Sequence, residues 1–216
     1  MRRTPSPDGR TAPVAAPYDV RLLLTDAERT EAGALVEDRL RWLGLRGLPL
    51  PVRSGGPELD RQTRRAPGEA AGLFEDDVLL ACLILDPEPD LAPWGRAGSG
   101  PSLFLSRVHT LPAYPVDVLC LITLWASDHA ARLGLPCVRA EAPVRRDLGS
   151  DPIRPVLDRL QDMGWAIRST GKGTVDERVA RLEIAAESRP GLTALINCGV
   201  PLPSRPVLYS SGRCNW

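Results

Sequence analysis

Two side chains near the ends of apolar segments have the chemistry to move a proton. His109 lies near the end of the segment Leu103–Thr110, and imidazole, with an ordinary pKa of about 6.5, can take up a proton near neutral pH. Glu141 ends the segment Cys137–Glu141, and its carboxylate could receive a proton directly or through a water molecule. Each has a structural alternative: His109 could be hydrogen-bonded inside a packed sheet, and Glu141 could be an exposed charge at a strand end.

Two further pairs of charged residues lie in predicted loops or turns. Arg145 and Arg146 follow a predicted strand, and their guanidinium groups could bind a phosphate. Glu75 and Asp76 lie at a predicted hairpin turn and could face an amine substrate. Solvated surface charge is the alternative for both pairs. The second histidine, His129, falls on the polar part of a predicted helix and is expected at the surface.

The cysteines indicate neither a metal site nor a catalytic thiol. Their spacing contains no C-x-x-C pair, and no base lies close in sequence to Cys198 or Cys214. Cys82, Cys120 and Cys137 lie in apolar surroundings, so we expect them to be small buried side chains. No resident metal is therefore predicted.

The balance of charge argues against a strongly charged partner. Basic and acidic residues number 27 each, for a net charge of zero, so neither a nucleic acid nor a membrane surface is expected to bind. No apolar run approaches the roughly 20 residues that span a bilayer. Residues 1–17 are rich in Arg, Pro, Ser and Thr and lack the apolar stretch of a secretory signal. We therefore expect a disordered leader and a cytoplasmic location.

Hydrophobic periodicity predicts strands and helices in alternation. A short first strand at Val20–Leu24 is followed by Thr25 and Glu28, which form a capping box for a helix over Asp26–Leu43. The stretch Pro49–Gly68 has no periodicity and is predicted to be mainly a loop.

The remaining elements follow from apolar runs bounded by glycine and proline. They are a hairpin over Ala71–Leu85, a strand over Leu103–Thr110, a helix over Val116–Leu133, a strand over Cys137–Glu141, a helix with Asp151 as N-cap that ends at Gly164, and strands over Trp165–Ser169 and Arg178–Ala186. The predicted order is β-α-loop-β-β-β-α-β-α-β-β, followed by a Pro/Gly-rich tail.

This order, and two stretches within it, resemble the GNAT family of N-acyltransferases. HTLPAYPVDVLCLITLWASDHAARLGLPCVRAEA resembles the family's run of strand end, phosphate loop, long helix and next strand, and VLDRLQDMGW resembles its later helix. The resemblance covers about Val20 to Ala186. It implies an α/β (α+β) GNAT-like fold, in which helices flank a central, mixed, mostly antiparallel and splayed sheet. The implied domain is 18–188, with a leader at 1–17 and a C-terminal extension at 189–216 packed on or near it.

The resemblance also implies a thioester donor, either an acyl-CoA or an acyl group on phosphopantetheine. Divergence of the central strand from its neighbour would free backbone N–H groups near Val108 and Thr110 for the thioester carbonyl. Tyr114 would lie at the phosphate loop near the cleft, or pack against the following helix. Leu160 stands where the family often has a tyrosine that protonates the leaving thiolate, so that acid is missing.

The expected phosphate loop departs from the family's Arg/Gln-x-x-Gly-x-Gly/Ala pattern. Pro115 has no N–H to donate, and Val116 and Val118 replace glycines that allow close approach of the backbone. Asp117 brings a negative charge to the helix end where an anion would bind. A structural explanation accounts for the same residues: Asp117 starts the helix and the valines belong to the core.

Three functions remain open at this point. Two are enzymes that move an acyl group to the amine of a small molecule, one taking it from an acyl carrier protein and the other from an acyl-CoA held by side chains such as Arg145. The third is a catalytically silent domain that binds a ligand or partner. His109 and Glu141 favour an enzyme, whereas the altered loop and Leu160 favour the silent domain.

Overall fold

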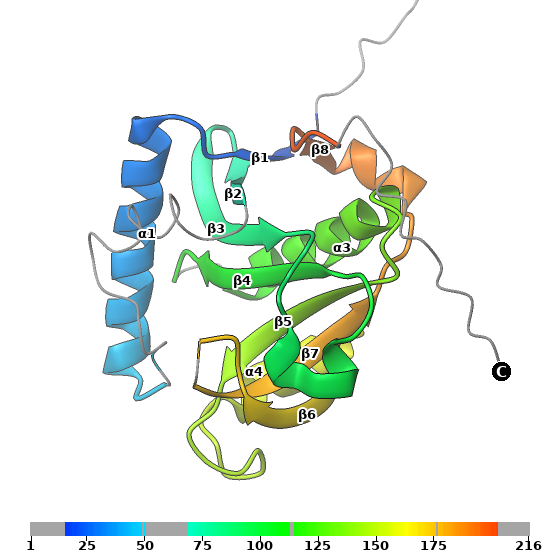
Figure 1. The fold of residues 1–216 in the computed structure, drawn as a ribbon. Coiled ribbons are helices and arrows are strands. Elements are labelled where there is room, and N and C mark those ends of the chain that lie inside the picture. The colour runs from blue at the N-terminus through cyan, green and yellow to red at the C-terminus, as the bar shows by residue number, and fades with distance from the viewer. Residues whose placement is uncertain (1–15, 49, 51–68, 113–114, 176, 203–216) are drawn as a thin grey trace, which may run out of the picture.

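Strands dominate the computed structural model of the chain, which describes residues 16–48, 50, 69–112, 115–175 and 177–202 (Figure 1). The strands are β1 (Tyr18–Leu22), β2 (Glu69–Glu75), β3 (Val78–Asp86), β4 (Leu103–Thr110), β5 (Cys137–Pro143), β6 (Ala166–Lys172), β7 (Arg178–Ala185) and β8 (Ile196–Cys198). They form one sheet in the order β6-β7-β5-β4-β3-β2-β1-β8. The pairs β4–β5 and β1–β8 are parallel and the others are antiparallel. The predicted mixed, mostly antiparallel sheet is therefore confirmed.

Helices cover both faces of the sheet (Figure 1). The α-helices are α1 (Asp26–Leu45), α3 (Pro115–Arg132) and α4 (Arg154–Asp162), and the 3-10 helices are η1 (Ala92–Gly98) and η2 (Pro190–Ala194). The capping box of α1 is confirmed: Thr25 Oγ1 accepts from the Glu28 N–H, and Glu28 Oε2 accepts from the Thr25 N–H. None of the described helices is long and apolar enough to cross a bilayer.

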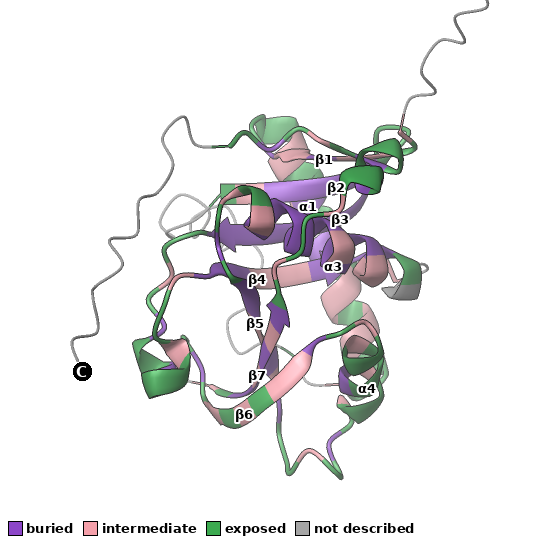
Figure 2. Cartoon of the chain, turned by 90° about the vertical axis from the view of Figure 1, so that its right-hand side faces the viewer, coloured by how far each residue is buried: buried purple, intermediate pink, exposed green. Residues whose placement is uncertain are grey.

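Two apolar layers hold these elements together. The larger lies under α3 and α4 and includes Leu103, Val118 and Leu157, all of them buried. The smaller lies under α1 and includes Leu35 and Cys82. Because β3 contributes to both layers, it is buried along almost its whole length (Figure 2). This agrees with the sequence, in which the strand is apolar at nearly every position.

The structure corrects the predicted start of α4. Asp151 does not cap the helix, which begins three residues later at Arg154. Its carboxylate instead accepts hydrogen bonds from the backbone N–H groups of Arg145, Arg146 and Ile153. Asp151 therefore organises the connection between β5 and α4.

The structure also corrects the expected exposure of His129, which is 3% exposed. Its ring stacks on Trp125 with centroids 5.0 Å apart, and Cys198 Sγ lies 3.9 Å from its Nδ1. The cover is non-local, because β8 pairs with β1 and brings the C-terminal segment over α3. The exact limits of the predicted extension at 189–216 stay a prediction, as does the leader, most of which lies outside the described residues.

Candidate functional site

The parallel strands β4 and β5 are paired only at their beginnings. The paired positions are Leu103–Val138, Phe104–Arg139 and Leu105–Ala140. Farther along, β5 pairs with β7 alone, whereas β4 continues against β3 as far as Thr110. The two strands therefore diverge, as the predicted splayed sheet requires.

A β-bulge in β4 lies where the two strands separate. The pairing with β3 shifts by one residue between Ser106 and His109, so β4 carries one extra residue there. Arg107 adopts a φ of 52°, a left-handed conformation that costs a residue other than glycine about 1–2 kcal/mol. Residues 106–108 are half-buried in a strand that is otherwise buried. The bulge therefore faces the opening between β4 and β5.

His109 and Thr110 lie on opposite faces of the sheet. His109 pairs with Cys82, which belongs to the apolar layer under α1. Thr110 pairs with Ala81, which belongs to the layer under α3. Directly opposite residues of antiparallel strands share a face, so His109 lies on the α1 face and Thr110 on the α3 face.

Thr110 directs its backbone N–H toward the opening between β4 and β5. The next N–H, that of Leu111, donates to Leu80 O on β3 at 2.8 Å. Successive N–H groups of a strand point to opposite sides, so the Thr110 N–H points away from β3. The Thr110 hydroxyl is buried and has no hydrogen-bond partner among the described residues. The geometry suits binding of a carbonyl oxygen, although such a role for Val108 and Thr110 stays a prediction.

His109 is neutral at pH 7. The residue is buried, with only 6% of its surface exposed. Burial, followed by the charges of Arg39 and Arg107, lowers the pKa of His109 to about 4. The ring can therefore accept a proton, but it is a weak base in this state. Its role as the catalytic base stays a prediction.

Hydrogen bonds fix the carboxylate of Glu141. Trp94 Nε1 donates to Oε1 at 2.6 Å, and Thr174 donates its N–H to both oxygens at 3.0 Å and its hydroxyl to Oε2 at 2.8 Å. The Trp94 ring also lies near Arg139 and Arg181, whose guanidinium carbons are 5.9 and 5.7 Å from its centroid. Glu141 therefore holds η1 and the β6–β7 connection on the sheet. To act as a base it would have to release one of these donors, so its catalytic role also stays a prediction.

Solved structures with this arrangement of strands and helices are available for comparison. An acetyltransferase of the GNAT family from Listeria monocytogenes aligns over 78% of this chain and 94% of its own, with a TM-score of 0.61 and 15% identity. The PaiA N-acetyltransferase from Thermoplasma acidophilum, solved in complex with coenzyme A, aligns over 78% and 98%, with a TM-score of 0.52 and 13% identity. The chain has the GNAT fold.

A further GNAT-fold match is FeeM, an N-acyl amino acid synthase from uncultured soil microbes. It aligns over 78% of this chain and 91% of its own, with a TM-score of 0.53 and 11% identity. No protein-family model matches the chain, and no curated protein matches it by sequence. At these identities the likeness establishes the GNAT fold and leaves the substrates to be argued from the site.

The loop between β5 and α4 presents two exposed arginines at the edge where both parallel strands end. Arg145 and Arg146 donate their backbone N–H groups to Asp151 Oδ2 at 2.6 and 2.7 Å. Burial tends to raise the pKa of Asp151, but the hydrogen bonds from Ile153, Arg146 and Arg145 outweigh it and hold the pKa below its usual value. Both arginine side chains are exposed and form no ion pair within the described part of the chain. They are therefore available to an anion.

The start of α3 is acidic. Asp117 is exposed in the first turn, where the helix dipole is positive. Burial, together with the nearby carboxylates of Glu75 and Asp117, raises the pKa of Tyr18, so both charges lie near this side chain. Val118 is buried in the core, as the structural explanation requires. Tyr114 lies outside the described residues.

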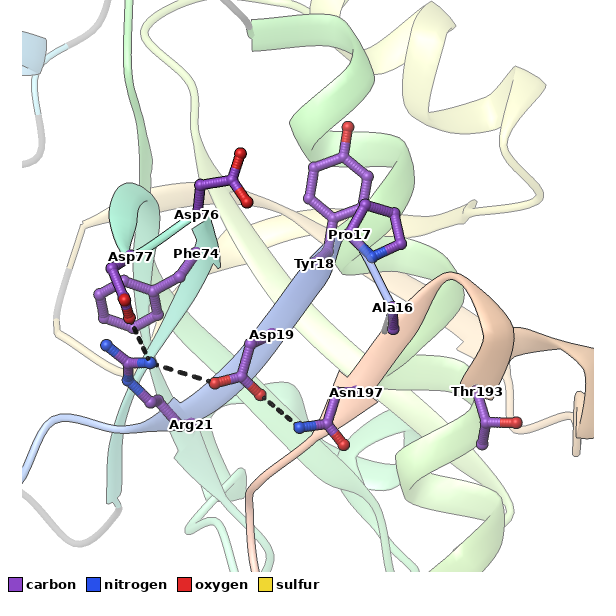
Figure 3. Close-up of a pocket in the computed structure, with 10 residues that line it drawn as sticks. All are labelled: Ala16, Pro17, Tyr18, Asp19, Arg21, Phe74, Asp76, Asp77, Thr193 and Asn197. Carbon is purple, nitrogen blue, oxygen red and sulfur yellow. Dashed lines mark hydrogen bonds and ion pairs between the residues drawn. The ribbon is translucent and has the colours of Figure 1, made fainter. Parts of the chain in front are cut away.

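Glu75 ends β2, and Asp76, the first residue of the β2–β3 turn, lines a hollow of about 480 Å³ (Figure 3). The turn has the positive φ angles of a type I′ hairpin, 47° at Asp76 and 64° at Asp77. The hollow is lined by Ala16, Pro17, Tyr18, Asp19, Arg21, Phe74, Asp76, Asp77, Thr193 and Asn197. Arg21 pairs with Asp19 at 3.3 Å and with Asp77 at 3.1 Å, whereas Figure 3 shows the Asp76 carboxylate directed away from it. Two of its three carboxylates thus share the single positive charge of Arg21.

This hollow is separate from the opening in the sheet, because β2 and β3 lie between β1 and β4. Contacts of Glu75 and Asp76 with a substrate stay a prediction. In the part of the chain that the structure describes, no group of three or more His, Cys, Asp or Glu residues could hold a metal ion.

Sequence reasoning missed two residues of the site. Arg39 on α1 contributes to the charge around His109. Arg39 comes four residues after Leu35 and three after Val36, so it shares their face of the helix. A charged residue on this apolar face was the signal in the sequence that could have identified it. Trp94 was a large aromatic residue in a connection that otherwise reads as Pro/Gly-rich, and it is 3% exposed.

Proposed function

We propose that this GNAT-fold protein transfers an acyl group from a thioester to the amine of a small molecule. The observation that carries the proposal is the separation of β4 from β5 after Leu105 and Ala140, with a bulge in β4 at the opening. Backbone donors directed into such an opening can stabilise the negative charge that develops on a thioester oxygen. GNAT-fold matches that carry the names of N-acetyltransferases and of an N-acyl amino acid synthase support this class of reaction.

In the proposed step the amine nitrogen attacks the thioester carbon. A C–N bond forms and the C–S bond breaks. The attacking nitrogen gives up its second proton, and the departing thiolate takes one up. His109 is the proposed acceptor of the proton that the ammonium group loses, and Glu141 is the second candidate. The products are an amide and a thiol.

The donor is proposed to be held without the usual contact at the start of α3. Asp117 would repel a pyrophosphate there, whereas Arg145 and Arg146 are exposed at the edge where β4 and β5 end. A carrier-bound phosphopantetheine, with its single phosphodiester, needs fewer phosphate contacts than coenzyme A. An acyl carrier protein is therefore the donor that we propose first, and an acyl-CoA the second.

The test measures thioester loss and thermal shift with acetyl-CoA and with an acyl-loaded carrier protein, each mixed with a panel of small amines. Turnover with the acyl-loaded carrier protein but not with acetyl-CoA would identify the carrier protein as the donor. His109→Ala should abolish turnover, and Arg41→Gln, an exposed change on α1, should leave it intact. Absence of any response to either donor would contradict the proposal.

A silent ligand-binding domain is the second candidate. The negative charge of Asp117 at the start of α3, and Leu160 in place of an acid, favour it. A thermal shift with either donor, without thioester loss for any amine, would select this function.

A further inference from the structure

Arg39 has a buried nitrogen that lacks an acceptor. Its Nη1 is buried and has no hydrogen-bond partner in the described part of the chain. The contact that the structure gives its guanidinium group is the ring of Trp42, whose centroid lies 4.5 Å away. The guanidinium carbon of Arg46 lies 4.3 Å from the centroid of the same ring, so two cations meet at this aromatic side chain, and no ion pair to a carboxylate is found for Arg39 among the described residues. A buried guanidinium N–H without an acceptor is costly, which indicates that an anion belongs there.

This cation lies close to the proposed proton acceptor. Arg39 continues the buried stripe of α1, which packs on β3 and β4, and its charge acts on His109. Within the described part of the chain, the other groups known to face His109 are also positive or neutral: Arg107 is a cation, and burial raises the pKa of the paired Cys82 thiol to about 12. The α1 face of the opening is therefore electropositive around His109.

We propose that the acceptor is an amine that carries a carboxylate, and that Arg39 binds this carboxylate on the α1 face beside His109. The inference rests on the proposed acyl transfer and names the class of its acceptor. A guanidinium group suits a carboxylate because its planar donors can engage both oxygens at once. An amino acid is the simplest compound that has both groups.

The same contact explains how His109 becomes a competent base. Burial and the charges of Arg39 and Arg107 hold the pKa of His109 near 4 when no acceptor is bound. A carboxylate on Arg39 cancels part of this positive charge, so the pKa of His109 rises toward neutrality when the amine must lose its proton. An amine without a carboxylate leaves the charge in place. One contact therefore contributes to the affinity for the acceptor and also makes His109 more basic, although burial still holds its pKa down.

The donor's phosphate is the other anion in the proposed reaction, and its candidate ligands belong to a different element. Arg145 and Arg146 are in the β5–α4 connection, whereas Arg39 is on α1 (Figure 1). Arg39 is therefore assigned to the acceptor.

Proton NMR can test the inference without any turnover, since the chain has only two histidines. The imidazole signals of the full chain are titrated alone and with saturating glycine, L-leucine or L-phenylalanine, each compared with its amide. His129→Gln assigns the two signals. We expect at least one amino acid, and none of the amides, to raise the pKa of His109 by about one unit or more.

Three variants define the role of Arg39. Arg39→Gln should weaken binding of the amino acid about tenfold or more and remove the shift of His109, whereas Arg39→Lys should retain part of both. Arg41→Gln, on an exposed part of the same helix, should behave as the wild type.

The inference is overturned if no amino acid shifts His109, if an amide shifts it equally, or if Arg39→Gln binds like the wild type. It is also overturned if Arg39→Gln weakens acetyl-CoA binding and leaves amino acid binding unchanged, because Arg39 would then serve the donor. Amino acid binding through Arg39 without acyl transfer to any donor would support the inference and contradict the proposed enzyme.

Discussion

Leu105 and Ala140 are the last pair of residues that joins β4 to β5, and β4 continues to Thr110 beyond them. The opening exists because, beyond this pair, β5 is paired only with β7 and β4 is paired only with β3. Arg107, with its left-handed backbone, changes the course of β4 within this opening. The candidate groups His109 and Thr110 are therefore placed by the same departure from regular pairing.

Thr110→Val tests the buried hydroxyl in this opening. Thr110 Oγ1 is buried without a partner among the described residues, so a methyl group in its place should raise the free energy of unfolding by about 1 kcal/mol. Urea denaturation measures this change. If the hydroxyl contacts the thioester, the same variant should lose acyl transfer while becoming more stable. Thr110→Ser keeps the hydroxyl and is the control; a less stable Val variant would contradict the expectation.

Gly72→Ala tests the packing between the β2–β3 hairpin and α1. A Cβ at Gly72 would lie 2.7 Å from both Leu79 Cδ1 and Phe74 Cε2, so we expect a loss of about 1–3 kcal/mol in the free energy of unfolding. Gly33 is the matched control within α1, since a Cβ there meets nothing within 4 Å. Gly33→Ala should stabilise by about 0.5–1 kcal/mol. Equal effects of the two changes in thermal or urea unfolding would contradict this account.

Local signals in the sequence were sufficient for most of the fold. Thr25 and Glu28 marked the start of α1, and the acidic pair Asp76 and Asp77 marked the hairpin turn, because caps and turns depend on neighbours in the chain. The sheet as a class was also predictable, because the order of elements resembles one family. What this order could not give was the short strand β8, which is stabilised by its pairing with β1.

The candidate site was predictable only in part. The position of His109 near the end of β4 followed from the strand order, but its pKa is lowered first by burial and then by the charge of Arg39, which belongs to a helix far away in sequence. The hydrogen bond between Trp94 and Glu141 joins residues 47 positions apart, so no local pattern could reveal it. Non-local contacts of this kind decide whether a carboxylate is free or engaged.

His129 should make the protein sensitive to mild acid. Burial and the charge of Arg132 outweigh the opposing charge of Asp128 and lower the pKa of His129 to about 4. The unfolded chain takes up this proton near pH 6.5, whereas the folded chain does not, so stability falls as the pH decreases from about 6.5 to 4. The contribution is on the order of 1–3 kcal/mol across this window.

His129→Gln removes this contribution, so its free energy of unfolding should depend less steeply on pH between 7 and 4.5 than that of the wild type. The pKa of His109 is also lowered, and this residue remains in the variant. The free energy of unfolding of the variant should therefore still decrease somewhat as the pH falls. Parallel curves for the variant and the wild type, measured by urea denaturation, would show that His129 is not held neutral in the folded state.

Arg145→Gln combined with Arg146→Gln tests the phosphate contact. Both side chains are exposed, and their backbone positions are fixed by Asp151, so the double variant should fold normally. We expect the KM for an acyl-CoA to rise by about tenfold, which corresponds to the loss of one or two charge-assisted hydrogen bonds. Acyl-pantetheine lacks phosphate and is the control donor. A similar rise in KM for both donors would contradict a phosphate contact.

Glu141→Gln and Trp94→Phe together decide what Glu141 does. Trp94 Nε1 and Thr174 already occupy both carboxylate oxygens, so each variant should lower the free energy of unfolding by about 1–2 kcal/mol. If Glu141 only positions η1 and the β6–β7 connection, both variants should affect kcat similarly, because both loosen the same contact. If Glu141 is the base, Glu141→Gln should lower kcat far more than Trp94→Phe does, since only that change removes the proton acceptor. The occupied lone pairs lead us to expect the first result, with the proton passing to His109, and steady-state kinetics at a temperature where both variants are folded will distinguish the two.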